Sequence, residues 1–161
     1  MQALQGTRNA AGLRFAVVVS KYNDFVTRPL LAGALEALAD ARVSDQDITV
    51  VHVPGAFELP VAAHRLATTG RFAGVVCLGC LIRGATPHFE YVASAVAHAL
   101  ASASARLGVP ITFGVLTTNA AEEALERAAP GPSNKGREAA MAAVEMATLF
   151  RALDGPVEGG V

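Results

Sequence analysis

The stretch from Val75 to Val92, VVCLGCLIRGATPHFEYV, joins an apolar run to a short polar turn and then to a helix-like segment. An unbroken apolar run of this length is typical of a strand buried on both faces of a parallel sheet. Thr86 is a favoured N-cap residue, and Pro87 suits the first helical position because its missing N–H is not needed there. The stretch therefore predicts a strand, a turn and a helix.

The same alternation recurs along the chain. Strand-like runs cover residues 14–20, 48–53, 73–82 and 111–117, and helical segments cover residues 24–41, 58–69, 87–107, 120–129 and 135–153. A Pro-Gly-Pro breaker at 130–132 separates the last two helices. Because such alternation implies right-handed crossovers, we expect a three-layer α/β/α sandwich with a central four-stranded parallel sheet. Residues 1–161 would form one domain, with its core at about 14–153 and loose tails on both sides.

Composition and charge exclude several classes of protein. The formal net charge of −1 gives no basic field for nucleic acid or for an anionic membrane. The longest nearly uncharged apolar run, residues 72–82, is too short to span a bilayer, and no signal peptide precedes Arg14. We therefore expect a cytoplasmic protein that binds neither nucleic acid nor membranes.

The two cysteines, Cys77 and Cys80, have the C-x-x-C spacing of redox and zinc motifs. A redox pair of this spacing opens a helix, whereas these residues lie inside a predicted strand, where residues three apart face opposite sides. No second cysteine pair or nearby histidine completes a zinc site. We expect two buried, inert thiols and no metal.

Polar and aromatic residues follow the ends of the first two predicted strands, where doubly wound sheets bind ligands. Tyr22 and Asn23 could stack on and hydrogen-bond a flat heterocycle; alternatively, Tyr22 packs at the rim and Asn23 or Asp24 caps a helix. Gly55 would allow an unusual backbone turn. Glu58 either binds sugar-like hydroxyls or only complements a helix dipole.

His88 is the strongest candidate for catalysis. It lies in the first turn of a predicted helix, where the dipole disfavours imidazolium, so it should be a neutral base near pH 7. The free N–H groups around Ala85 and Thr86 would form an anion site beside it. Of the other histidines, His64 and His98 fall in the middle of predicted helices, where a packing or surface role is expected, and His52 lies in the second strand without an evident partner.

Three residues in the second half of the chain have more than one possible role. Lys135, one of only two lysines, opens the last helix, where an anionic ligand would compensate for its unfavourable position in the dipole. Arg127 either caps the preceding helix or clamps a phosphate. Phe113 lies inside the fourth strand and belongs to the core by default.

Taken together, these segments resemble the lumazine synthase family of riboflavin biosynthesis. The matching segments are YNDF (22–25), VPGAFELP (53–60), LGCLIRGATPHFEYV (78–92), FGVLTTNAAEEALERA (113–128) and NKGREAAMAAVEM (134–146). The resemblance implies a flavodoxin-like strand order. It also implies condensation of 5-amino-6-(D-ribitylamino)uracil with 3,4-dihydroxy-2-butanone 4-phosphate, without a cofactor, to give 6,7-dimethyl-8-ribityllumazine, phosphate and water.

The resemblance further implies a role for each matching residue, with His88 shuttling protons. The uracil would be bound by Tyr22, Asn23, Ala56, Phe57, Glu58, Cys80, Leu81, Ile82, Phe113 and Lys135. The butanone phosphate would be bound by Gly84, Ala85, Thr86 and Arg127. Phe113, Arg127 and Lys135 would reach in from a neighbouring subunit of a homopentamer, which revises the default placement of Phe113 in the core.

Two departures from the family pattern leave questions open. Tyr22 stands where the family usually has Phe or Trp. The PGPS loop at 130–133 differs from the Gly-Lys-containing loop of members that assemble twelve pentamers into a hollow shell, so a pentamer and a shell both stay open. The competing functions are a non-catalytic protein that stores a lumazine or flavin, a Schiff-base enzyme with Lys135 as nucleophile, and a riboflavin synthase of the same fold.

Overall fold

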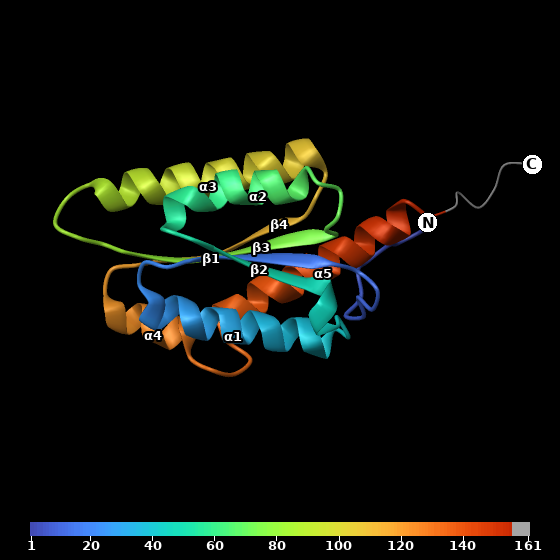
Figure 1. The fold of residues 1–161 in the computed structure, drawn as a ribbon, viewed down its shortest axis with the longest axis horizontal. Helices are drawn as coiled ribbons and strands as arrows, with labels where there is room; N and C mark the ends of the chain where they lie inside the picture. The colour runs from blue at the N-terminus through green and yellow to red at the C-terminus, as the bar shows by residue number, and fades with distance from the viewer. Residues whose placement is uncertain (156–161) are drawn as a thin grey trace, which may run out of the picture.

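A parallel sheet forms the middle layer of the protein in a computed structural model that describes residues 1–155 (Figure 1). Its strands are β1 (Phe15–Ser20), β2 (Ile48–Val53), β3 (Gly74–Ile82) and β4 (Ile111–Thr118). All neighbouring pairs are parallel, and the order across the sheet is β2-β1-β3-β4. This is the predicted four-stranded, flavodoxin-like sheet, and each strand begins and ends within one residue of its predicted bounds.

Helices cover both faces of the sheet. The helices α2 (Leu59–Ala67) and α3 (His88–Leu107) lie on one face, and α1 (Asp24–Asp40), α4 (Ala121–Ala128) and α5 (Lys135–Leu153) lie on the other (Figure 1). Two short 3₁₀ helices, η1 (Asp45–Asp47) and η2 (Ala56–Glu58), flank β2. The helix predicted at 58–69 corresponds to α2, which begins one residue later and ends two residues earlier, and η2 lies directly before it. The three-layer sandwich is confirmed.

The two central strands, β1 and β3, are apolar on both faces because each face has its own core. Along β1, Val17 packs with the core under α1 and α5, whereas Val18 packs with the core under α2 and α3. Cys80 and Cys77 divide in the same way, one on each face. The period-two alternation of a strand explains why the two thiols of the C-x-x-C do not meet.

The start of α3 differs from the prediction. The N-cap position is Pro87 and not Thr86, and no side chain caps this helix. Pro87 has a helix-compatible φ of −72° but a ψ of 5°, so the helical conformation begins one residue later, at His88. His88 still lies in the first turn, as predicted.

The N-terminal tail, which was predicted to be loose, contacts the rest of the domain from Thr7 onward. The hydroxyl of Thr148, in α5, accepts a hydrogen bond from the Thr7 N–H at 2.8 Å and donates to the Thr7 carbonyl at 3.1 Å. Ala10 is fully buried, and its N–H donates to the carbonyl of Ala41. These contacts fix the segment across the ends of α1 and α5. The predicted tail at 154–161 lies mostly outside the described residues.

Candidate active site

A cavity of about 620 Å³ opens at the carboxyl ends of β1, β2 and β3. Because the chain continues from β1 to one side of the sheet and from β3 to the other, this is the switch point at which doubly wound sheets bind ligands. We call it the switch-point cavity. It is lined by Tyr22, Asn23, Gly55, Ala56, Phe57, Glu58, Cys80, Leu81, Ile82, His88 and Val92.

Asn23 connects the two strands at the switch point. Its backbone is left-handed, with a φ of 60°, a conformation in which asparagine is enriched among non-glycine residues. Its side chain makes no helix-capping bond; instead, the amide Nδ2 donates to the carbonyl of Cys80 at 2.9 Å. Asn23 thus occupies the N-cap position of α1 without a side-chain cap, and its amide holds the end of β3 at the cavity.

Gly55 and Glu58 shape the wall contributed by the turn after β2. The prediction that Gly55 adopts an unusual conformation is wrong, because its φ of −142° and ψ of −179° are ordinary extended values. Space requires the glycine instead: a Cβ there would lie 2.7 Å from the Tyr22 ring. Glu58 Oε2 accepts the Gly55 N–H at 3.0 Å, so its structural role is present, and its second oxygen makes no protein hydrogen bond among the described residues.

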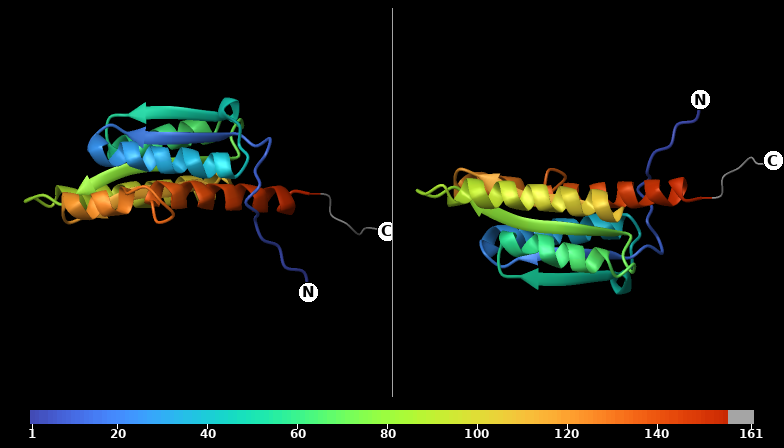
Figure 2. Two further views of the ribbon diagram at one scale, coloured as in Figure 1. Left: turned by 90° about the horizontal axis from the view of Figure 1, so that it is seen from below. Right: turned by 90° about the horizontal axis from the view of Figure 1, so that it is seen from above.

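His88 and the turn before it lie at the open side of the cavity. The loop Gly84–Pro87 is exposed and extends beyond the end of the sheet, at the extreme left of the left panel of Figure 2. Gly84, Ala85 and Thr86 do not line the cavity, although Thr86 is only two residues before His88. Within residues 1–155, their backbone N–H groups donate to no protein acceptor. These donors are available to an anion.

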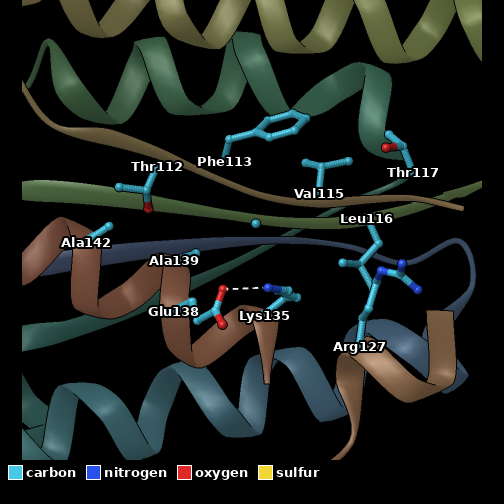
Figure 3. A pocket seen from close by; sticks show the side chains of 11 residues that line it. Thr112, Phe113, Val115, Leu116, Thr117, Arg127, Lys135, Glu138, Ala139 and Ala142 are labelled. Atoms are coloured by element: carbon cyan, nitrogen blue, oxygen red, sulfur yellow. Dashed lines mark hydrogen bonds and ion pairs between the residues drawn. The ribbon is translucent and has the colours of Figure 1, made fainter. Parts of the chain in front are cut away.

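A second cavity, of about 450 Å³, lies beside the edge strand β4 (Figure 3). It contains the other three predicted site residues, Phe113, Arg127 and Lys135. Phe113 is 46% exposed, so its default assignment to the core is wrong for a single chain. We call this second hollow the edge cavity.

The two cations of the edge cavity come from different helices. Arg127, near the end of α4, donates to the carbonyl of Glu123 at 3.1 Å, one turn back inside the helix, so its side chain does not cap the last carbonyls of α4. Lys135 Nζ lies 2.8 Å from Glu138 Oε2, so a carboxylate from the next turn already pairs with it (Figure 3). Glu138 was not among the predicted residues, although its i+3 spacing from Lys135 would have indicated it.

Apart from Gly84, Ala85 and Thr86, which line neither cavity, the predicted site residues fall into two separate groups. The switch-point cavity and the edge cavity have no lining residue in common. Phe113, Arg127 and Lys135 belong to the second group and do not reach the first cavity within one chain.

The remaining candidates from the sequence lie elsewhere. His52 is exposed on β2, whereas His64 and His98 line a different hollow between α2 and α3. Burial raises the pKa of Cys77 from 9.0 to about 12 and that of Cys80 to about 11, as expected of inert thiols. No three His, Cys, Asp or Glu side chains within residues 1–155 are grouped so that they would hold a metal ion. None of the helices described for this chain has the length and apolar character needed to cross a membrane.

The chain is similar to known proteins over most of its length. The family model for 6,7-dimethyl-8-ribityllumazine synthase matches residues 12–151. A 6,7-dimethyl-8-ribityllumazine synthase from Syntrophus aciditrophicus (strain SB) is 52% identical over 147 residues, which cover 91% of this chain and 96% of that protein. The matched region spans every element that surrounds the two cavities. The chain therefore belongs to the 6,7-dimethyl-8-ribityllumazine synthase family.

Proposed function

We propose that this protein condenses 5-amino-6-(D-ribitylamino)uracil with 3,4-dihydroxy-2-butanone 4-phosphate to give 6,7-dimethyl-8-ribityllumazine, phosphate and water. The observation that carries the proposal is the switch-point cavity, which combines aromatic rings, backbone groups, a carboxylate and His88 at one edge of the sheet. The reaction would be a cofactor-independent transfer in riboflavin biosynthesis.

The uracil would occupy the switch-point cavity. Tyr22 and Phe57 are 71% and 65% exposed, so their rings are available to stack on a flat heterocycle or to cover its ribityl chain. Backbone groups of Cys80, Leu81 and Ile82 would meet the pyrimidine edge, held in place by the Asn23 amide. The Glu58 carboxylate has an oxygen free to accept a ribityl hydroxyl.

The butanone phosphate would lie at the mouth of the cavity. The exposed N–H groups of Gly84, Ala85 and Thr86 would hold its phosphate at the positive end of α3, and Arg127 would complete the clamp. His88 would then stand beside the carbonyl that the uracil amine attacks. Each step of the condensation moves a proton between weak acids and bases, which suits an imidazole.

The active site would be completed by a second copy of the chain. Within one chain the edge cavity is separate from the switch-point cavity, so Phe113, Arg127 and Lys135 have to come from a neighbour to meet the substrates. A head-to-tail contact of this kind repeats until a ring closes. We propose a cytoplasmic homopentamer, with a shell of twelve pentamers as the larger alternative.

The direct test is to mix the purified protein with both substrates and follow the absorbance of the lumazine together with the release of inorganic phosphate. We expect one phosphate for each lumazine and no product when either substrate is omitted. Bound chromophore without turnover would support a storage protein instead. Consumption of lumazine alone would support a riboflavin synthase, and a borohydride-trapped adduct on Lys135 would support the Schiff-base mechanism.

A further inference from the structure

Arg83 joins the end of β3 to the phosphate loop, Gly84–Thr86, yet it lines neither cavity. Its backbone N–H donates to the Thr118 carbonyl at 2.8 Å, and its Nε donates to Asn119 Oδ1 at 2.9 Å. These two contacts attach it to the end of β4.

The same side chain also reaches the first turn of α3, on the far side of the loop. The Arg83 guanidinium pairs with the Glu90 carboxylate and lies over the Phe89 ring, 4.6 Å from the ring centroid. Glu90 and Phe89 directly follow His88 in the chain. One guanidinium therefore connects the strand end before the loop to the helical turn after it.

The loop itself has little else to fix its shape. Gly84 lies in open space, since a Cβ added there would meet nothing within 4 Å. Apart from the Arg83 N–H bond, the nearest backbone bond in the described part of the chain runs from the Tyr91 N–H to the Pro87 carbonyl, at 3.4 Å. The conformation of a short exposed loop with few internal contacts depends on the contacts that keep its two ends at a fixed separation.

The ion pair between Arg83 and Glu90 also affects the charge beside the phosphate loop. The Glu90 carboxylate lies in the same helical turn as His88, near the N–H groups that would receive a phosphate dianion. An unpaired carboxylate at this position would repel the phosphate. Arg83 neutralises it through Nη1, while Nε of the same guanidinium donates to Asn119 Oδ1.

We infer that Arg83 is a positioning residue of the active site: it holds the phosphate loop and the first turn of α3 in the conformation that binds the phosphorylated ketone and presents His88. The inference rests on the proposed function. Arg83 acts through the loop and through Glu90 and does not itself contact the substrates.

The test compares Arg83→Gln and Arg83→Lys with a matched control. Arg71 supplies the control, because its guanidinium also lies over a phenylalanine ring, that of Phe72, but before β3, at the amino end of the strand. For every variant, KM is measured separately for each substrate, together with kcat, Tm and the inhibition constant of inorganic phosphate.

Arg83→Gln should raise KM for the butanone phosphate and weaken inhibition by inorganic phosphate, each by about tenfold or more, because the anchored loop is lost. KM for the uracil should change by less than about twofold, and Tm should stay the same because a half-exposed ion pair contributes little to global stability. Arg83→Lys should recover part of the loss, since lysine restores the charge but not the fork. Arg71→Gln should leave all of these values unchanged.

Asn119→Ala should act in the same direction as Arg83→Gln, and the two changes combined should cost less than the sum of their separate effects. Equal increases in both KM values, unchanged phosphate inhibition in Arg83→Gln, or full additivity with Asn119→Ala would overturn the inference. If the unaltered protein makes no lumazine, the proposed function fails; the Arg83 inference is then decided by calorimetric binding of inorganic phosphate, which the Arg83 and Asn119 variants should weaken and Arg71→Gln should not.

Discussion

His88 is exposed at the mouth of the switch-point cavity, next to backbone donors that no protein group uses within residues 1–155. A proton-transferring imidazole has to reach both the reacting atoms and water, so a position at the rim is suitable. The proposed rate enhancement has two sources at this site: the holding of two substrates together, and the movement of protons by one side chain.

Replacement of His88 separates these two contributions. His88→Ala should reduce kcat by about 10²–10⁴-fold and leave a measurable rate, because substrate positioning survives the loss of the imidazole. KM for both substrates should change little. Steady-state kinetics at saturating substrate measures the effect, and an unchanged kcat would contradict the proton-shuttle role.

Arg127 should act on one substrate only. Arg127→Ala removes the cation proposed to clamp the phosphate, so KM for the butanone phosphate should rise by about tenfold or more while KM for the uracil stays nearly constant. The hydrogen bond from Arg127 to the Glu123 carbonyl is exposed, and its loss should have little effect on Tm. A selective rise in KM for the uracil would contradict the phosphate-binding role proposed for Arg127.

The buried Cys77 thiol predicts a dependence of stability on pH. Its pKa is about 12 in the folded protein and 9.0 when unperturbed, so below pH 9 the thiol is protonated in both states. As the pH rises above 9, the unfolded chain loses this proton and the folded chain keeps it, so the contribution of this thiol to the free energy of unfolding falls by roughly 1 kcal/mol per pH unit. The Cys80 thiol, with a pKa of about 11, adds a decline of its own. Urea unfolding at pH 8–10.5 measures this decline.

Cys77→Ala provides the control for the other groups that titrate in this range. The variant has a lower stability at every pH because of the lost volume, but its decline above pH 9 should be shallower than that of the unaltered protein. Parallel declines would mean that the thiol does not stay protonated in the folded state.

At the scale of single elements, the loop between α4 and α5 depends on Asn134, which is 2% exposed. Its Oδ1 accepts the Arg137 N–H at 2.9 Å and so caps α5, and its Nδ2 donates to the carbonyl of Ala128 at 2.8 Å and to that of Pro29 at 3.2 Å. One side chain thus fixes the ends of α4 and α5 against α1. These are the helices that carry Arg127 and Lys135.

Asn134→Ala should therefore lower the free energy of unfolding by about 2 kcal/mol or more, from the lost cap and from carbonyl groups left without a donor. The neighbouring change Ser133→Ala is a control, since Ser133 is exposed. Denaturant unfolding of both variants is the measurement. A loss in Asn134→Ala no larger than that in Ser133→Ala would contradict the role given to this side chain.

The elements themselves could be predicted because their signals are local. Apolar runs bounded by Gly and Pro located all four strands to within one residue, and the alternation of strand and helix predicted a parallel sheet. The start of α3 and the fixed N-terminal segment could not be predicted in this way. The first depends on the ψ of Pro87, and the second on a hydrogen bond between Thr7 and Thr148, far apart in the sequence.

The side chains of the candidate site could be predicted from the sequence, but the contacts that position them could not. Tyr22, Glu58 and His88 were identified because they follow strand ends, and they line one cavity. The bond from Asn23 to Cys80 and the contacts of Arg83 join different elements, so no spacing along the chain reveals them. The need for glycine at position 55 could not be predicted either, because it comes from the nearby ring of Tyr22 and not from the backbone conformation of Gly55.

At the scale of the whole molecule, the main consequence is the separation of the proposed site into two halves. The switch-point cavity carries His88, and the edge cavity beside β4 carries Arg127 and Lys135 (Figure 3). A single chain offers each half to solvent. The proposed active site therefore exists only where the switch-point cavity of one subunit meets the edge cavity of the next.

Complementation between impaired subunits tests this claim most directly, with activity measured at a butanone phosphate concentration far below KM, where both variants are slow. His88→Ala and Arg127→Ala subunits, each with its own affinity tag, are refolded together in equal amounts, and mixed oligomers are purified through both tags. If neighbours share each site, about one quarter of the interfaces combine two unaltered halves, and activity should return to about one quarter of that of the unaltered protein. Activity no higher than the mean of the two separate variants would show that each site lies within one chain and would contradict the account.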